Sequence, residues 1–389
     1  MTTYRTIEQD RKLKQAVGEL WGTVQKQEAA RIEEVEFLPI SEDASIGTAE
    51  NKEPKFTLTP YTIDSSDINV GLKLEHRKKG LLWYATYRVN FEAKYSIKND
   101  FDKEKYFRFT YSFPSRDGIY DNFIFSVDGQ AIKDIQLTDG VVKHTLRLKP
   151  GQAAKLDISY GSQGMDEWWY VFGKNVTQIR NFKLTATTDF DDIDFPENGI
   201  SPTLKTKTAK GQSLTWQYAS LISGIQIGIG MPQKLNPGPF ASRVSYFAPV
   251  SLFLFLFLIF IISIIRKIDI HPMNYFFVSA AFFSFHLLLT YLADHTDIYL
   301  AFTISSIVSI LLVTSYMRLV VGLRFALLEI GISQLIYLVF FSYTFFLSGY
   351  TGLTVTICCI LTLFAVMQFT GKTDWGTIYS QRNIERPKT

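Results

Sequence analysis

The sequence predicts a multidomain membrane protein, with an N-terminal, mainly antiparallel β-sandwich domain and a C-terminal bundle of five transmembrane α-helices. One observation is the charge distribution: the 125 residues from Tyr246 to Thr370 contain eight charged residues. The other is the alternation of apolar and polar residues between turn signals in the preceding part. The 40 Lys+Arg and 37 Asp+Glu nearly balance, which argues against a nucleic-acid binder that relies on bulk positive charge.

The first segment, residues 1–34, is expected to hold an amphipathic helix. Apolar side chains recur in it at three- and four-residue spacing, the pattern of a helix with one buried face. They are Leu13, Val17, Leu20, Trp21 and Val24.

Residues 35–230 are expected to form the β-sandwich. The clearest strand covers Trp83–Lys98, where apolar and polar residues alternate over sixteen positions. Turn signals such as Asp128-Gly129, Asp139-Gly140 and Pro150-Gly151 separate this run from similar ones. Many strands at short spacing with little helical pattern are typical of a large antiparallel sandwich.

A Pro-rich connector, residues 231–245, is expected to lead into a transmembrane domain at residues 246–370 and a cytoplasmic tail at 371–389. A spanning helix needs about 20 mostly apolar residues. Five segments meet this condition, the last of them being short: Tyr246–Ile265, Met273–Ala293, Ile298–Met317, Phe325–Leu347 and Leu353–Phe369.

The Lys and Arg residues between these spans predict the orientation. They occur in the first connection, in the third and in the tail, whereas the second and fourth connections have none. The positive-inside rule then places the C-terminus in the cytoplasm and the sandwich outside it. Residues 1–30 contain no apolar export signal, so we expect a hydrophobic segment upstream of Met1.

Several local motifs resemble the CreD family of bacterial inner-membrane, cell-envelope integrity proteins. They are Trp21-Gly22, Glu75–Leu81, Ser115–Ile119, Thr188–Phe190, Gly199–Pro202, Leu214–Trp216, His271–Tyr275 and Thr373–Trp375. The resemblance implies a multi-pass protein of the inner membrane with a periplasmic domain and a role in the envelope stress response. The family also has a span before its outer domain, whereas this sequence starts where that span would have ended.

An aromatic run in the sandwich, Trp168, Trp169 and Tyr170, is a candidate ligand-binding platform for a sugar or lipid. On a strand, Trp168 and Trp169 point to opposite faces, so one is outward if the other is in the core. Packing in the core or against the membrane is the favoured interpretation.

The acidic residues Asp189, Asp191 and Asp192 are weak candidates for a metal site, because carboxylates suit hard cations such as calcium. The run lacks the glycine and the final glutamate of an EF-hand loop. A solvated loop or strand edge is the favoured interpretation, and we expect neither a metal nor a cofactor.

Four ionisable residues lie in or beside the predicted spans, where such groups are functional candidates by default. They are His286, Arg318, Arg324 and Glu329. A structural ion pair between Glu329 and Arg318 or Arg324 is the favoured interpretation, and His286 is expected to be a hydrogen-bonded packing residue.

No GxSxG, HExxH, Walker A or GxGxxG motif is present. With the CreD-like resemblance and the large strand domain, this absence makes the leading hypothesis a non-enzymatic envelope-integrity protein that binds the lipid bilayer and, through its sandwich, an envelope protein, glycan or lipid. One alternative is a transport or lipid- or glycan-handling component whose sandwich delivers a ligand to the helices. It requires a polar cavity containing His286 and Glu329, or an apolar groove in the sandwich. Another is a glycan or lipid enzyme with Asp189, Asp191 or Asp192 as acid and base, which requires two carboxylates in one cleft. The oligomeric state stays open.

Overall fold

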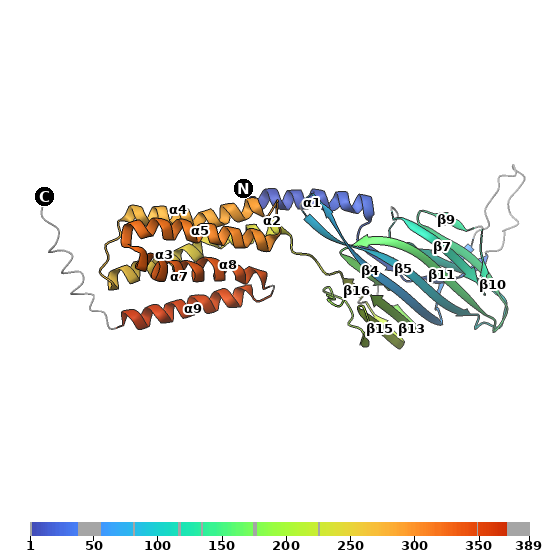
Figure 1. Cartoon of the computed structure of the whole chain (residues 1–389). Helices are drawn as coiled ribbons and strands as arrows, with labels where there is room; N and C mark the ends of the chain where they lie inside the picture. The colour runs from blue at the N-terminus through green and yellow to red at the C-terminus, as the bar shows by residue number, and fades with distance from the viewer. Residues whose placement is uncertain are drawn as a thin grey trace, which may run out of the picture. The chain divides into compact units, whose positions relative to one another are not determined.

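The computed structural model describes residues 2–37, 56–80, 82–115, 118–133, 135–173, 177–224, 226–347 and 349–371. The chain divides into two compact units (Figure 1). One comprises Asp10–Lys234, and the other comprises Leu235–Thr389 together with Met1–Gln9. The tail predicted at 371–389 lies outside the described residues except for Gly371.

The first unit is built around an eight-stranded sheet (Figure 1). Its strands, in spatial order, are β14 (Leu204–Lys207), β15 (Gln212–Ser223), β13 (Thr177–Thr188), β4 (Ser65–Lys79), β5 (Leu82–Lys98), β11 (Ala153–Met165), β7 (Tyr120–Val127) and β8 (Gln130–Ala131). All neighbours in it are antiparallel except β13 and β4, which are parallel.

A five-stranded sheet and a three-stranded sheet complete this unit. The five-stranded order is β3 (Phe56–Tyr61), β2 (Arg31–Phe37), β6 (Lys105–Ser112), β10 (Val141–Leu148) and β9 (Gln136–Thr138). The three-stranded order is β1 (Gln25–Glu28), β12 (Glu167–Val171) and β16 (Ile227–Gly230), with β1 parallel to β12.

The sheets pack face to face through aromatic rings, which makes the unit a sandwich. Tyr95 of β5 lies 5.7 Å from Phe109 of β6, measured between ring centroids, and Phe109 stacks on Phe125 of β7 at 5.9 Å. The predicted alternation of β5 is confirmed from Tyr87 onward, since Val89 and Phe91 are fully buried while Asn90 and Glu92 are exposed. At the start of the strand it fails, because Tyr84 and Thr86, expected on the outer face, are buried as well. Full burial stabilises the fold by about 1.5–3 kcal/mol for each large apolar side chain.

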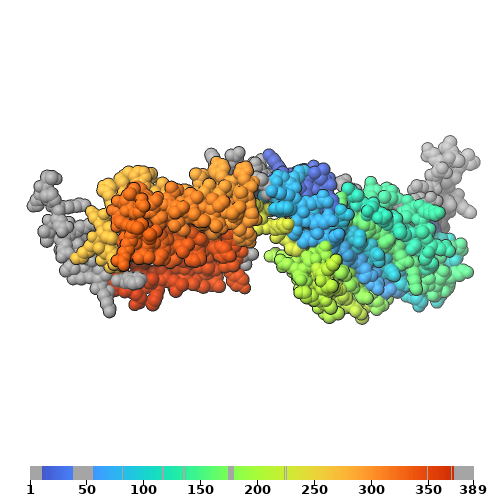
Figure 2. All heavy atoms as spheres, viewed as in Figure 1, coloured from blue at the N-terminus to red at the C-terminus, as the bar shows by residue number. Residues whose placement is uncertain are grey.

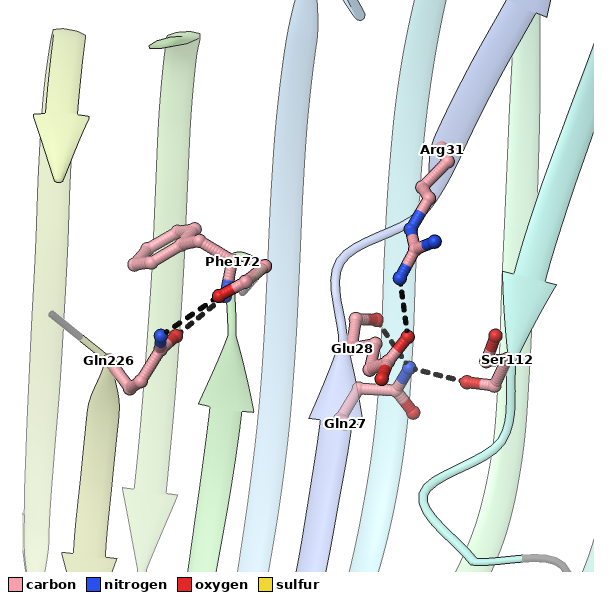
Figure 3. A network of polar contacts seen from close by, with 7 residues as sticks. Gln27, Glu28, Arg31, Ser112, Phe172 and Gln226 are labelled. Atoms are coloured by element: carbon pink, nitrogen blue, oxygen red, sulfur yellow. Dashed lines mark hydrogen bonds and ion pairs between the residues drawn. The ribbon is translucent and has the colours of Figure 1, made fainter. Parts of the chain in front are cut away.

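Two glutamine side chains, the buried Gln27 and the half-buried Gln226, satisfy backbone groups where strands of the sandwich end (Figure 3). Nε2 of Gln27 donates to the carbonyls of Glu28 and Ser112, at 2.7 and 3.0 Å. Oε1 of Gln226 accepts a hydrogen bond from the amide of Phe172 at 2.7 Å. An unpaired backbone group at these depths would carry a desolvation cost, so the glutamines stabilise the strand ends.

The N-terminal helix α1 (Thr2–Trp21) is confirmed but ends earlier than the segment predicted for it. Gly22 follows with φ of 130°, and a Cβ there would lie 2.4 Å from the carbonyl oxygen of Gln163. Only glycine fits both conditions, so the helix stops here. The next residues form β1 and β2 within the sandwich instead of a continued helix.

The second unit contains five helical segments long and apolar enough to cross a membrane among the described residues, which confirms the predicted number. They are α3 (Ala248–Ile265), α4 (Pro272–Leu292), α5 (Ile298–Val321), the fourth span Leu323–Phe346, and α9 (Thr351–Thr370), of which Thr351–Gln368 is the candidate span. In Figure 2 the side chains fill most of the space between the helix ribbons of Figure 1.

The fourth span alternates between helix types. It comprises α6 (Leu323–Phe325), the π-helical turns η1 (Ala326–Gly331) and η2 (Leu335–Phe340), the short helices α7 (Ile332–Gln334) and α8 (Phe341–Tyr343), and the 3₁₀ turn η3 (Thr344–Phe346). π-Helical turns are rare and frequently mark functional sites.

The predicted connector includes a helix, α2 (Pro237–Tyr246), in place of a semi-rigid Pro-rich segment. Its first turn contains Pro237 and Pro239, and the first turn is where a missing backbone N–H costs no hydrogen bond. Phe240, Ala241 and Val244 of this helix are buried in the apolar core of the second unit.

Candidate functional sites

The predicted aromatic platform is divided between the core and the surface. Trp168 and Tyr170 on β12 are 0% and 1% exposed, because alternate positions of this strand face the sandwich interior. Trp169 points the other way and is half-buried, and its indole N–H donates to Glu167 Oε2 at 2.8 Å. Its ring lies flat on Gly228, where a Cβ would be 2.7 Å from the indole. The three rings therefore do not share one surface.

The acidic candidates lie in an exposed loop that follows β13. Asp189 Oδ1 accepts a hydrogen bond from the amide of Leu74 at 2.9 Å. Asp191 pairs with Lys207 at 3.4 Å, and Asp192 is exposed. Within the described ranges, no group of three or more His, Cys, Asp or Glu side chains could hold a metal ion.

Glu329 pairs with Arg266, so the predicted pairing with Arg318 or Arg324 is wrong. Arg266 Nη2 donates to Glu329 Oε1 at 3.2 Å. Arg266 follows the last turn of α3, which contacts η1 of the fourth span, whereas Arg318 and Arg324 are exposed on either side of the turn at Gly322. Proximity along the chain suggested the wrong partner, because helix packing determines which side chains meet.

His286 is packed among aromatic rings on α4, as expected, but the hydrogen bond expected for it is not formed with the described residues. Its side chain is 5% exposed and lies between the rings of Phe282, Phe283 and Phe285, with centroid distances of 4.9–6.0 Å. Neither ring nitrogen has a hydrogen-bond partner among the described residues. His286 and Glu329 are therefore not joined by a hydrogen bond.

The fourth span has polar contacts with several neighbouring helices that the sequence reasoning missed. Gln334 is fully buried and donates to Ser309 Oγ of α5 at 2.9 Å, and Ser309 donates to the carbonyl of Ala281 on α4 at 2.9 Å. The hydroxyls of Tyr337 and Thr362 on α9 are 2.7 Å apart. Gln334 was the sequence signal for these contacts, because a polar residue within an apolar span usually forms a hydrogen bond to another helix.

A shallow polar hollow of about 230 Å³ lies on the sandwich. Its lining is Tyr61, Thr62, Asp64, Asp100, Phe101 and Arg180. Burial, and then the negative charge of Asp100, raise the pKa of the Asp64 carboxyl above its ordinary value. None of the residues predicted as sites lines this hollow.

A second surface of the sandwich, absent from the sequence prediction, carries exposed aromatic and apolar side chains beside arginines. We call it the aromatic–arginine face; it consists of Phe37, Phe56, Leu58, Tyr106, Arg108 and Arg147. Phe37 and Phe56 are opposite each other on β2 and β3, and Tyr106 packs edge-on against Phe37 at 5.3 Å. The guanidinium carbon of Arg108 is 4.3 Å from the centroid of Phe56. Strand alternation alone could not show it, because apolar residues on an outer sheet face have the same spacing as core residues.

Comparison with known proteins gives a family match in the C-terminal half. Residues 202–376 match the family described as inner membrane protein CreD. No curated protein matches the chain.

One solved structure that resembles part of the chain is a protein from Legionella pneumophila subsp. pneumophila str. Philadelphia 1, described as a "putative nutrient binding protein". It is 10% identical, covers 43% of this chain and 67% of its own, and has a TM-score of 0.29. A likeness at this level carries no argument about function.

The matched region contains all five candidate spans, and it includes three of the motifs that suggested the resemblance. With these spans the chain is a multi-pass helical protein of the inner membrane, and over residues 202–376 it matches the CreD family of inner membrane proteins.

Proposed function

We propose that the protein acts without catalysis in maintaining the cell envelope, and that its sandwich binds an envelope protein outside the cytoplasm. The family match supports the membrane location. The distribution of Lys and Arg between the spans supports the orientation.

The aromatic–arginine face is the observation on which the binding role depends. The side chains of Phe37, Phe56 and Leu58 are 48%, 39% and 36% exposed on two adjacent strands. Isolated exposed apolar residues are common, but a contiguous group is a mark of an interaction surface. Aromatic residues and arginine are also the types enriched in protein interfaces.

Strand β3 adds a second feature of a binding surface. It is the terminal strand of the five-stranded sheet, and its first five residues are exposed. The free edge of such a strand can pair with an extended segment of a partner through backbone hydrogen bonds. The exposed rings beside it would then select among partners.

The test replaces Phe37, Phe56 and Leu58 by serine in the full-length protein. We expect the triple variant to reach the wild-type abundance in the membrane, to fail to restore envelope integrity to a deletion strain, and to lose cross-links from a photoreactive residue at Thr57. A matched control replaces Ile119, Leu204 and Ile222, which are 60%, 60% and 69% exposed elsewhere on the sandwich. Equal loss of function in both triple variants at equal abundance would contradict the assignment to this face.

A transport or lipid-handling role is the second candidate, and the polar atoms buried in the second unit favour it. Oε2 of Glu329, Oε1 of Gln334 and both nitrogens of His286 have no hydrogen-bond partner among the described residues. If this role holds, Glu329→Gln abolishes function at unchanged abundance. If Glu329→Gln lowers only the abundance, Glu329 is a structural member of its ion pair.

The absence of catalysis is itself part of the proposal. Replacement of Asp189 and Asp191 by alanine is expected to leave envelope integrity unchanged, because both residues lie in an exposed loop. Loss of function with an intact fold would instead favour a hydrolytic enzyme.

A further inference from the structure

One end of the sandwich carries two tryptophan rings surrounded by cationic side chains. The first ring is Trp21, at the end of α1. The guanidinium carbons of Arg77 and Arg88 lie 3.3 and 5.6 Å from its centroid. Glu75 pairs with both arginines, at 3.4 and 3.0 Å. This arrangement holds the β4–β5 hairpin against the helix.

The second ring is Trp83, on β5 of the same hairpin but on its other face, because Lys78 pairs with Trp83 whereas Arg77 pairs with Tyr84. The two clusters therefore flank the tip of the hairpin from opposite sides. The amino groups of Lys78 and Lys234 lie 6.0 and 4.3 Å from its centroid. Lys79 donates a hydrogen bond to the carbonyl of Ala16 on α1 at 3.2 Å. We call this set, namely Trp21, Arg77, Lys78, Lys79, Trp83, Arg88 and Lys234, the tryptophan–lysine surface.

The tryptophan–lysine surface has excess positive charge. Its five cations are accompanied by one carboxylate in ion-pair contact, that of Glu75. The amino group of Lys14 and a carboxylate oxygen of Asp166 form a further ion pair at 2.6 Å, which leaves the net charge of this end of the sandwich unchanged. Among the described residues neither Lys78 nor Lys234 has an ion-pair partner, so both amino groups can bind an anion in addition to their contact with Trp83.

The segment that leads to the membrane spans is fixed to this same end of the sandwich. A nitrogen of His76 lies 2.9 Å from the carbonyl oxygen of Pro232, and the amide of Met231 donates to the carbonyl of Asp166 at 2.8 Å. The side chain of Gln233 also bonds to Asp166, at 3.1 Å. Lys234 therefore belongs to the tryptophan–lysine surface and to the segment that continues into the spans.

The connection from this surface to the first span is short. Thirteen residues separate Lys234 from Ala248, where α3 begins, and ten of them form α2. A helix rises about 1.5 Å per residue, so α2 covers only about 15 Å. The length of the tether therefore limits how far the tryptophan–lysine surface can lie from the first span. The tether leaves the sandwich at one end of β5, whose 17 residues extend about 55 Å at roughly 3.3 Å per residue.

From this geometry we propose that the tryptophan–lysine surface binds the anionic phospholipid headgroups of the membrane in which the protein is anchored. Tryptophan rings favour the headgroup zone, and each Lys or Arg near an anionic membrane adds attraction. The chemistry recognised is a phosphodiester, and the short tether makes the lipid, rather than a free phosphate, its source. This inference rests on other residues than the aromatic–arginine face and does not depend on the proposed partner.

The experiment uses the full-length protein in nanodiscs of equal amounts of phosphatidylcholine and phosphatidylglycerol. A small share of the phosphatidylglycerol carries a photoreactive diazirine on its headgroup, and mass spectrometry locates the cross-links. We expect them at residues 73–88 and 231–234. The same label on phosphatidylcholine is expected to give few cross-links there.

The main variant is Arg77→Gln with Lys78→Gln and Lys234→Gln. The cross-link yield at this surface should fall about fivefold for each cation removed. Arg77→Lys with Lys78→Arg and Lys234→Arg should keep the wild-type yield. The matched control, Lys143→Gln with Lys149→Gln and Lys155→Gln, removes three exposed lysines elsewhere on the sandwich and should also keep it.

A second variant keeps the proposal testable if the first variant misfolds. Lys78→Gln with Lys234→Gln leaves the contact between Arg77 and Trp21 and both ion pairs of Glu75 in place, and it should still lose most of the yield. Unchanged yield in this double variant would overturn the proposal. So would equal labelling by the phosphatidylcholine probe, or competition by inorganic phosphate as effective as that by unlabelled phosphatidylglycerol, which would indicate a site for a soluble anion.

Discussion

The hydroxyl of Tyr111 donates a hydrogen bond of 2.8 Å to Oε1 of Gln27, and both side chains are fully buried between the sheets. Tyr160 donates to the same oxygen at 2.7 Å. Burial raises the pKa of both tyrosines well above the ordinary value, so the phenols stay protonated and keep donating. A polar side chain therefore fixes how β1 meets β6 and β11.

Replacement of Gln27 by leucine is expected to destabilise the sandwich by about 2–5 kcal/mol, because two buried hydroxyls lose their acceptor. The measurement is the free energy of unfolding of the purified protein in denaturant. Adding Tyr111→Phe and Tyr160→Phe to the leucine variant should recover part of the loss, since the unpaired hydroxyls are then gone. A leucine variant as stable as the wild type would contradict this account of the network.

Replacement of Gly228 by alanine is expected to destabilise the pairing of β12 with β16. The added Cβ would lie 2.7 Å from the Trp169 ring, and overpacking of this kind costs about 1–3 kcal/mol. The fluorescence of Trp169 and the unfolding temperature should both change. Gly352→Ala is the control, since a Cβ there meets nothing within 4 Å.

Much of the fold follows from sequence patterns, and the failures have identifiable causes. The alternation of β5 and the five apolar spans were predictable, because a buried face and a bilayer each impose a regular pattern. Strand β1 was not, because its inward residues Gln25 and Gln27 are polar and their partners lie far along the chain. Helix α2 was hidden by prolines that a first turn tolerates.

The site predictions depended on contacts that no pattern encodes. The aromatic run has the expected alternation, but only the fold shows that Trp168 faces the core and that Trp169 lies on Gly228. The partner of Glu329 required knowledge of which helices pack together. Arg266 became its partner through the contact of α3 with the fourth span.

A double-mutant cycle on Arg266→Gln and Glu329→Gln is expected to show coupling of about 0.5–1 kcal/mol, because the arginine side chain is 63% exposed and water screens the pair. The measurement is the free energy of unfolding of each variant in detergent. A cycle of Glu329→Gln with Arg318→Gln serves as the control and should give no coupling. Coupling between Glu329 and Arg318, without coupling between Glu329 and Arg266, would instead support the pairing expected from the sequence.

The stability of the sandwich should depend on His144. Burial lowers the pKa of the folded His144 below its ordinary value of 6.5. Below about pH 6.5 the unfolded chain therefore binds more protons at this residue than the folded protein does, so the free energy of unfolding falls as the pH falls. The wild type should lose more stability than His144→Asn between about pH 7 and pH 5. Parallel pH profiles of the two proteins would contradict the prediction.

The side of the membrane on which the sandwich lies tests the account most directly. Single cysteines at Lys149 and Thr389, in a background with Cys358→Ser and Cys359→Ser, would be exposed to a membrane-impermeant thiol reagent in intact cells whose outer membrane has been made permeable. The account predicts labelling at position 149 and protection at position 389. Protection at position 149 with labelling at position 389 in the same cells would place the sandwich in the cytoplasm, because five spans put the two positions on opposite sides of the membrane. That result would contradict a sandwich that binds an envelope partner.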